Sequence, residues 1–216
     1  MRTIIISITI MMGISATAQR VKMTPVKQVP EQGQVISKQG SSIAKTTAIN
    51  VTNQKQAPIG DLGIFDLKGP VKSFTLKNEW GSVTRTFDRK GLWLTIDGKP
   101  LRQVYTKGIR RDNNGRFVKG IMDEDGNGEE YYYNSDGRIT KRNYHFYDTT
   151  EENTYTYDSK GNLIKMDVVE GGMDASEPYT EEYVIQTTDK YGNWTERVTK
   201  IGSEKSIVTR TIVYYE

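Results

Sequence analysis

The sequence predicts an all-β protein in which residues 61–216 form an antiparallel meander of repeated hairpins. Short runs rich in Tyr, Thr, Val, Ile and Trp alternate with turn residues along this region. One turn pattern, Asp/Asn-x-x-Gly, occurs nine times, whereas random placement of the same composition would give about two matches. After residue 60 no stretch shows the apolar stripe of a helix.

The chain opens with the features of a secretory signal peptide, residues 1–18. Arg2 supplies a positive n-region, residues 3–14 are apolar, and residues 16–18 (Ala-Thr-Ala) fit a signal-peptidase site between Ala18 and Gln19. The apolar run is shorter than the roughly 20 residues that a membrane span needs, and a chain without Cys cannot be a lipoprotein. We therefore expect export to the periplasm or the cell exterior, with no membrane span in the mature chain.

Residues 19–60 have the composition of a flexible polar linker. They are rich in Gln, Ser, Thr, Lys and Pro and contain no aromatic residue. Such a segment buries too little apolar surface to offset the entropy lost on ordering. The sequence thus predicts three parts: signal peptide, linker and β domain.

The repeated turn has a physical explanation. Asp or Asn at its first position can accept backbone N–H groups of the turn, and Gly at its fourth position can adopt a positive φ. These properties suit a type I turn closed by a glycine bulge between two strands. The turns that we assign as structural are Asp66–Gly69, Asp88–Gly91, Asp112–Gly115, Asn134–Gly137, Asp158–Gly161 and Asp189–Gly192.

Strict alternation then assigns the faces of the strands. It places Leu92, Leu94 and Ile96 on one face, and Ile164, Met166 and Val168 on another. Alternation also marks residues 206–215 as a final strand, which we expect at an edge of the sheet, where it would be open to pairing with another chain.

Three of the repeats resemble a known family. Residues 133–140 (YNSDGRIT) and 157–164 (YDSKGNLI) resemble the YD repeats of RHS-type proteins, and residues 189–197 (DKYGNWTER) resemble a variant found in small exported proteins of Bacteroidetes. The resemblance covers roughly residues 61–216 and implies antiparallel hairpins laid side by side in a long curled sheet. It implies little about function.

Residues 123–134 (DEDGNGEEYYYN) raise the question of a metal site. Asp123, Asp125, Asn127 and Gly128 match positions 1, 3, 5 and 6 of a calcium loop. Position 12 is Asn134, which cannot supply a bidentate carboxylate, and the flanks predict strands rather than helices. We favour a structural turn and no cofactor, and keep a weaker calcium site at Asp123, Asp125, Asn127 and Glu129 as the alternative.

Catalytic constellations are missing from the sequence. His145 is the single histidine, and no Gly-x-Ser-x-Gly motif accompanies it. The carboxylate pairs Glu129-Glu130, Glu151-Glu152 and Glu181-Glu182 are adjacent residues, so the two members of each pair should point to opposite faces of a strand. A glycan-acting hydrolase is therefore a minor alternative, and we expect no enzyme.

Aromatic residues are the more informative group. An exposed aromatic row could stack on sugars or on a partner protein, although cross-strand packing explains aromatics equally well. The speculative ligand-binding residues are Trp80, Trp93, Trp194, Tyr131 and Tyr133.

The surface charge points to no particular partner. A formal net charge of +3 with interleaved signs predicts no attraction to nucleic acid. We expect a non-catalytic binding or scaffold protein of the cell envelope, with a glycan or an envelope protein as partner. The alternatives are a carbohydrate-binding module and a calcium-stabilised adhesion-type protein.

Overall fold

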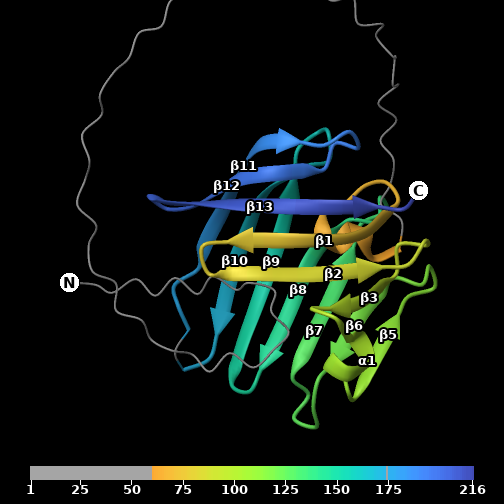
Figure 1. Ribbon diagram of the computed structural model, residues 1–216. Coiled ribbons are helices and arrows are strands. Elements are labelled where there is room, and N and C mark those ends of the chain that lie inside the picture. The colour runs from red at the N-terminus through yellow and green to blue at the C-terminus, as the bar shows by residue number, and fades with distance from the viewer. Residues whose placement is uncertain (1–59, 174) are drawn as a thin grey trace, which may run out of the picture. The chain divides into compact units, whose positions relative to one another are not determined.

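The computed structural model describes residues 60–173 and 175–216, so the predicted signal peptide and nearly all of the predicted linker lie outside the described residues. None of the helices in this described part has the length and apolar character required to cross a membrane. The elements, shown in Figure 1, are η1 (Gly60–Phe65), β1 (Val71–Asn78), β2 (Gly81–Phe87), β3 (Trp93–Ile96), β4 (Lys99–Pro100), α1 (Leu101–Val104), β5 (Gly108–Arg111), β6 (Phe117–Ile121), β7 (Gly128–Tyr133), β8 (Ile139–Phe146), β9 (Thr149–Tyr157), β10 (Leu163–Gly171), β11 (Tyr179–Thr188), β12 (Trp194–Ile201) and β13 (Glu204–Tyr214).

All thirteen strands belong to one antiparallel sheet, which confirms the predicted fold class. The order across the sheet is β4-β3-β2-β1-β13-β12-β11-β10-β9-β8-β7-β6-β5. The first and last strands along the chain, β1 and β13, pair with each other, so the two edges of the sheet are β4 and β5. The prediction that the final strand is an edge is therefore wrong, because β13 lies between β1 and β12.

Five of the six assigned turns form the predicted hairpin connection. In each, the Gly N–H donates to the carbonyl of the Asp or Asn at the first position, over 2.9–3.1 Å, and the Gly φ lies between +73° and +80°. These turns begin at Asp88, Asp112, Asn134, Asp158 and Asp189. The sixth match, Asp66–Gly69, does not connect two strands; it joins η1 to β1.

A shift in strand register follows each of these five turns. The extra residue brings the residue five positions after the turn's Asp or Asn into the core. These residues are at most 9% exposed, and they are Trp93, Phe117, Ile139, Leu163 and Trp194. Each unit of the repeat therefore contributes one large side chain to the interior.

A tyrosine links neighbouring repeats. The Tyr133 hydroxyl donates to the Phe117 carbonyl at 2.6 Å, and the Tyr157 hydroxyl donates to the Ile139 carbonyl at 2.9 Å. Each tyrosine stands immediately before its own turn and reaches the bulge of the preceding turn. The Arg116 guanidinium also lies over the Tyr133 ring, 4.4 Å from its centroid. Tyrosine, turn and bulge thus form one repeating structural unit.

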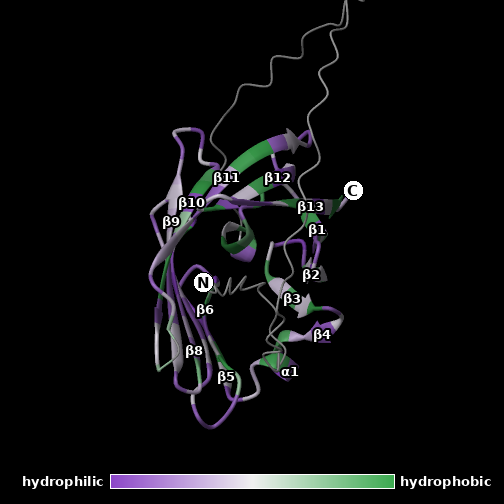
Figure 2. Ribbon diagram, turned by 90° about the vertical axis from the view of Figure 1, so that its left-hand side faces the viewer, coloured by the Kyte–Doolittle hydropathy of each residue, from purple (hydrophilic) through white to green (hydrophobic). Residues whose placement is uncertain are grey.

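The curled sheet wraps around η1, which lies against its concave face (Figure 2). Phe65 of η1 packs on Phe74, Phe87 and Trp93, with ring centroids 5.0–5.6 Å away. Asp61, which is fully buried, accepts hydrogen bonds from two bulge N–H groups on opposite sides of the opening, Trp93 at 2.8 Å and Phe117 at 2.6 Å. Asp61 therefore bridges the gap that strand pairing leaves between the β3–β4 and β5–β6 hairpins.

Candidate functional site

The speculative ligand-binding aromatics do not form an exposed row. Trp93, Trp194 and Tyr131 are only 2–3% exposed, and Tyr133 is half-buried. They are buried because the bulges and the inward alternation of β7 direct them to the concave face. Trp80 alone of the five is exposed, at 48%, in the β1–β2 turn. A sugar could not stack on the three buried rings without unfolding the core.

Trp194 shows what these rings do instead. Its ring lies against two guanidinium groups, that of Arg210 at 3.9 Å and that of Arg197 at 4.3 Å from the ring centroid. Arg210 also donates to the Trp194 and Phe65 carbonyls at 3.0 and 2.8 Å. Trp194 therefore helps to accommodate a buried cation that attaches η1 to β13.

The four speculative calcium ligands serve the turn and the interior. Asp123 accepts the Asn127 backbone N–H at 3.1 Å and the Asn127 side-chain amide at 2.7 Å. Asn127 is itself fully buried, whereas Asp125 is exposed and the Glu129 carboxylate points into the concave face. Within residues 60–173 and 175–216, no three His, Cys, Asp or Glu side chains are grouped so that they could hold a metal ion.

The concave face carries a buried ionic cluster that sequence reasoning did not predict. Glu129 accepts hydrogen bonds from Tyr105, from the Tyr131 hydroxyl at 2.7 Å and from the Arg142 Nε at 2.9 Å. Arg142 also donates to Glu151 at 3.2 Å. Glu129, Arg142 and Glu151 are each less than a tenth exposed. The cluster links β7, β8 and β9 beneath the apolar core.

The surroundings of this cluster stabilise the charged forms of both Glu129 and Arg142. Burial alone would raise the pKa of the Glu129 carboxyl, but the charge of Arg142 and the hydroxyls of Tyr105 and Tyr131 hold that pKa below its ordinary value. Burial lowers the pKa of Arg142, but the combined attraction of Glu129, Tyr131, Tyr155 and Glu151 is larger and raises that pKa well above its usual range. Both Glu129 oxygens are already used by protein donors, so the cluster acts chemically as a buried structural ion pair.

Glu181 is a different buried carboxyl on the same face. Burial raises its pKa, and the Tyr183 hydroxyl, which donates to it at 2.8 Å, compensates only in part. The prediction that adjacent carboxylates point to opposite faces agrees with these positions. Glu129, Glu151 and Glu181 are buried, and each is followed by a more exposed partner. The sequence analysis did not predict that Glu129, Glu151 and Glu181 all lie on the same face of the sheet. The register between neighbouring strands would have indicated it.

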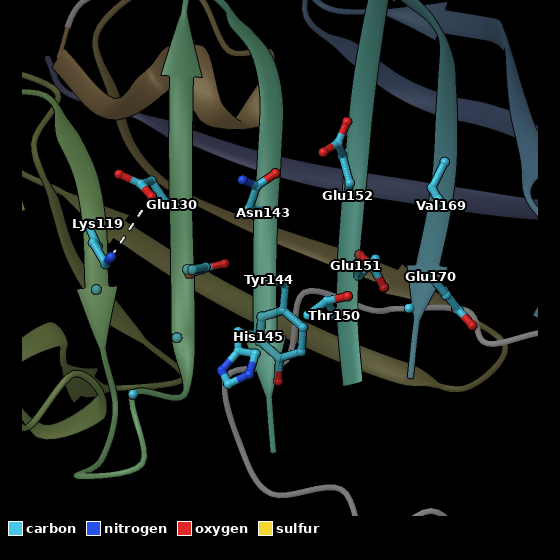
Figure 3. A pocket seen from close by; sticks show the side chains of 15 residues that line it. Lys119, Glu130, Asn143, Tyr144, His145, Thr150, Glu151, Glu152, Val169 and Glu170 are labelled. Atoms are coloured by element: carbon cyan, nitrogen blue, oxygen red, sulfur yellow. Dashed lines mark ion pairs between the residues drawn. The ribbon is translucent and has the colours of Figure 1, made fainter. Parts of the chain in front are cut away.

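The convex face has a groove that crosses β6 to β10, with a volume of about 460 Å³. Figure 3 shows one wall as a row of side chains from successive strands: Lys119, Glu130, Asn143, Glu152 and Val169. His145 and Thr150 belong to the opposite wall, which glycines complete at both ends. His145 lies in β8, is exposed and lines this groove.

The two edges of the sheet are unequal. β4 has two residues, ends in Pro100 and is followed by α1, which packs against β3 and β4. β5 has four residues, of which Gly108, Ile109 and Arg110 are exposed. Very short length and proline protect an edge strand from pairing, so β4 is protected, whereas β5 is longer, has no proline and is the more accessible edge.

No protein-family model matches the chain, and no curated protein matches it.

Proposed function

We propose that this protein is an exported, non-catalytic binding or scaffold protein of the cell envelope, built from YD-like hairpins, that binds a partner strand at β5. The N-terminal signal features support export, and the repeated unit of tyrosine, turn and bulge supports the YD-like description. The observation that carries the binding function is the open β5 edge. A partner segment can add to such an edge through main-chain hydrogen bonds.

The charges around β5 select the partner. Residues 107–111 (Lys-Gly-Ile-Arg-Arg) contain three cations and no acid. Lys107 and Arg110 are paired with Glu124 and Glu130, at 2.7 and 2.6 Å, yet their side chains remain 44% and 64% exposed. Pairing of β5 with a second copy of itself would place like charges together, which is unfavourable. An extended segment with acidic side chains is the better match.

The test is binding of a labelled peptide that alternates Glu and Val, followed by fluorescence anisotropy with the mature chain. Reversal of charge in Arg110→Glu should weaken binding about tenfold, because a cross-strand attraction becomes a repulsion. Ile109→Pro should also weaken it, by disturbing main-chain pairing at the edge.

Lys99→Glu is the matched control, because it changes the same charge on the protected edge. Its affinity should stay close to that of the unaltered protein. Equal losses for Lys99→Glu and Arg110→Glu would show non-specific charge attraction, and absence of peptide binding would refute the proposal.

A further inference from the structure

We propose that the convex groove over β6–β10 is a second binding site, specific for a neutral, extended oligosaccharide. This proposal does not depend on the β5 edge, and it uses none of the aromatic residues that the sequence suggested for sugar binding. It rests on the register of five strands, the charge balance of the groove walls and the state of the groove floor.

Strand register builds the two walls. Direct pairing across neighbouring strands aligns Lys119, Glu130, Asn143, Glu152 and Val169 in one row. The same pairings align Gly128, His145, Thr150 and Gly171 in the other row. The rows are two residues apart along each strand, or about 7 Å, and four strand spacings give a length of about 19 Å.

Glycines keep the second wall low at both ends. Gly128 and Gly171 have no side chain to close the groove, and a Cβ on Gly171 would lie only 2.5 Å from the Thr150 hydroxyl oxygen. His145 and Thr150 are thus the side chains of this wall, between two gaps. The groove is therefore open at its ends and suits a chain-like ligand rather than a compact one.

The charges of the walls favour a neutral ligand. Glu130 lies 2.6 Å from Arg110 and 3.9 Å from Lys119, and Glu152 lies 2.5 Å from Lys141. Each of these two wall carboxylates has a cation beside it, so this wall offers neither a polyanion nor a polycation a large field to neutralise. Each carboxylate also has more acceptor positions than one cation uses. These positions can accept hydroxyl groups.

Hydroxyl chemistry fits the remaining wall residues. Asn143, His145 and Thr150 can each both donate and accept hydrogen bonds, which matches sugar hydroxyls. Val169, which is 49% exposed, offers an apolar surface for the C–H face of a sugar ring. The spacing between strands is close to the length of one unit in an extended glycan, so successive strands can contact successive sugars.

The groove floor argues against a peptide ligand. The floor is the backbone of internal strands, and β7, β8 and β9 each pair with neighbours on both sides. Their N–H and C=O groups therefore serve the sheet and offer no main-chain pairing to a peptide. Recognition must come from side chains, which suits a glycan better.

The experiment is isothermal titration of the mature protein with cellotetraose, maltotetraose and chitotetraose. At least one should bind with a Kd of about 1 mM or tighter. The double substitution Asn143→Ala with His145→Ala should weaken that binding about tenfold or more, because it removes two hydrogen-bonding groups from facing walls. Circular dichroism melts check that the variant folds.

The control is the double substitution Thr75→Ala with Thr211→Ala, on strands β1 and β13 away from the groove. It should leave tetrasaccharide affinity unchanged. Failure of all three sugars to bind, or equal affinity of the groove variant and the unaltered protein, would overturn the proposal. The acidic strand peptide should bind the groove variant normally, so the two binding sites can fail separately.

Discussion

Replacement of Glu129 by Gln should destabilise the protein by about 3 kcal/mol at neutral pH. Removal of one partner from a buried ion pair costs about 3–5 kcal/mol, and the lower figure applies because Arg142 keeps Glu151 at 3.2 Å. Glu129→Gln also leaves two hydroxyl donors, from Tyr105 and Tyr131, facing an amide that can accept only through its oxygen.

Urea unfolding followed by tryptophan fluorescence measures this difference in the free energy of unfolding. The loss should also depend on pH in a defined direction. The folded pKa of Glu129 lies below its ordinary value of 4.5, so its contribution is complete above that value and is lost as pH falls through the lower folded pKa. The stability difference between the two proteins should therefore be constant near neutrality and shrink below about pH 4.

Glu130→Gln is the matched control, because Glu130 is the next residue and points to the convex face. Its ion pairs involve the well-exposed side chains of Arg110 and Lys119, and exposed pairs contribute about 0–1 kcal/mol. A loss below about 1 kcal/mol for Glu129→Gln, or one equal to that of Glu130→Gln, would refute the buried-cluster reasoning.

Four further substitutions test other parts of the structure. Glu181→Gln should leave the free energy of unfolding unchanged or raise it at neutral pH. The folded pKa of Glu181 is raised, so its carboxyl favours folding fully only below its ordinary pKa, and this contribution is lost as pH rises through the folded pKa. A clear loss of stability in urea unfolding would contradict this expectation. Asp61→Asn should lower the unfolding free energy by about 3 kcal/mol, since Arg111 at 2.8 Å loses its buried partner; thermal melting measures the loss, and an unchanged melt would argue against the bridging role. Gly115→Ala, at φ +77° with open space around it, should lower the free energy of unfolding by about 1 kcal/mol. Gly161→Ala, at φ +80°, should lower it more, because its Cβ would lie 2.5 Å from the Arg138 guanidinium. Equal losses for the two variants would show that the Arg138 side chain moves freely.

The sequence was sufficient to predict the fold class because the turn signal is local. Each Asp or Asn and each Gly acts within its own four residues, so nine matches could be recognised without knowledge of tertiary structure. The Asp66–Gly69 match failed for the same reason: a local pattern does not reveal that η1, rather than a strand, precedes it.

The faces of the strands were harder to predict, because each bulge shifts the alternation by one residue. Strict alternation grouped Leu94 with Ile96, yet Leu94 is 45% exposed and Ile96 is 2% exposed. Ile164, grouped with Val168, is likewise 39% exposed, whereas Val168 is buried. A turn closed by a glycine bulge already implies one unpaired residue, so counting it would have reassigned both strands.

The candidate sites depended on information that no single segment carries. The convex groove exists only because five strands align in register, and the open β5 edge exists only because β1 pairs with β13 instead of leaving the chain ends at the edges. Neither pairing partner can be inferred from the repeat itself, since every hairpin carries similar turn residues.

The adjacent Glu pairs connect stability with binding in this single-layer sheet. Glu129 and Glu151 share Arg142 in the interior, while Glu130 and Glu152 stand one residue further on, in the groove wall. Because a strand alternates its faces, fixing the inner carboxylates by a buried ion pair also fixes the positions of the outer ones. A ligand that contacts Glu130 and Glu152 would then meet carboxylates that are already aligned, which lowers the entropy lost on binding. The buried cluster is therefore expected to orient the groove, and Glu129→Gln should weaken tetrasaccharide binding under conditions where the variant remains folded. Unchanged sugar affinity in that folded variant would show that the two faces of the sheet act independently.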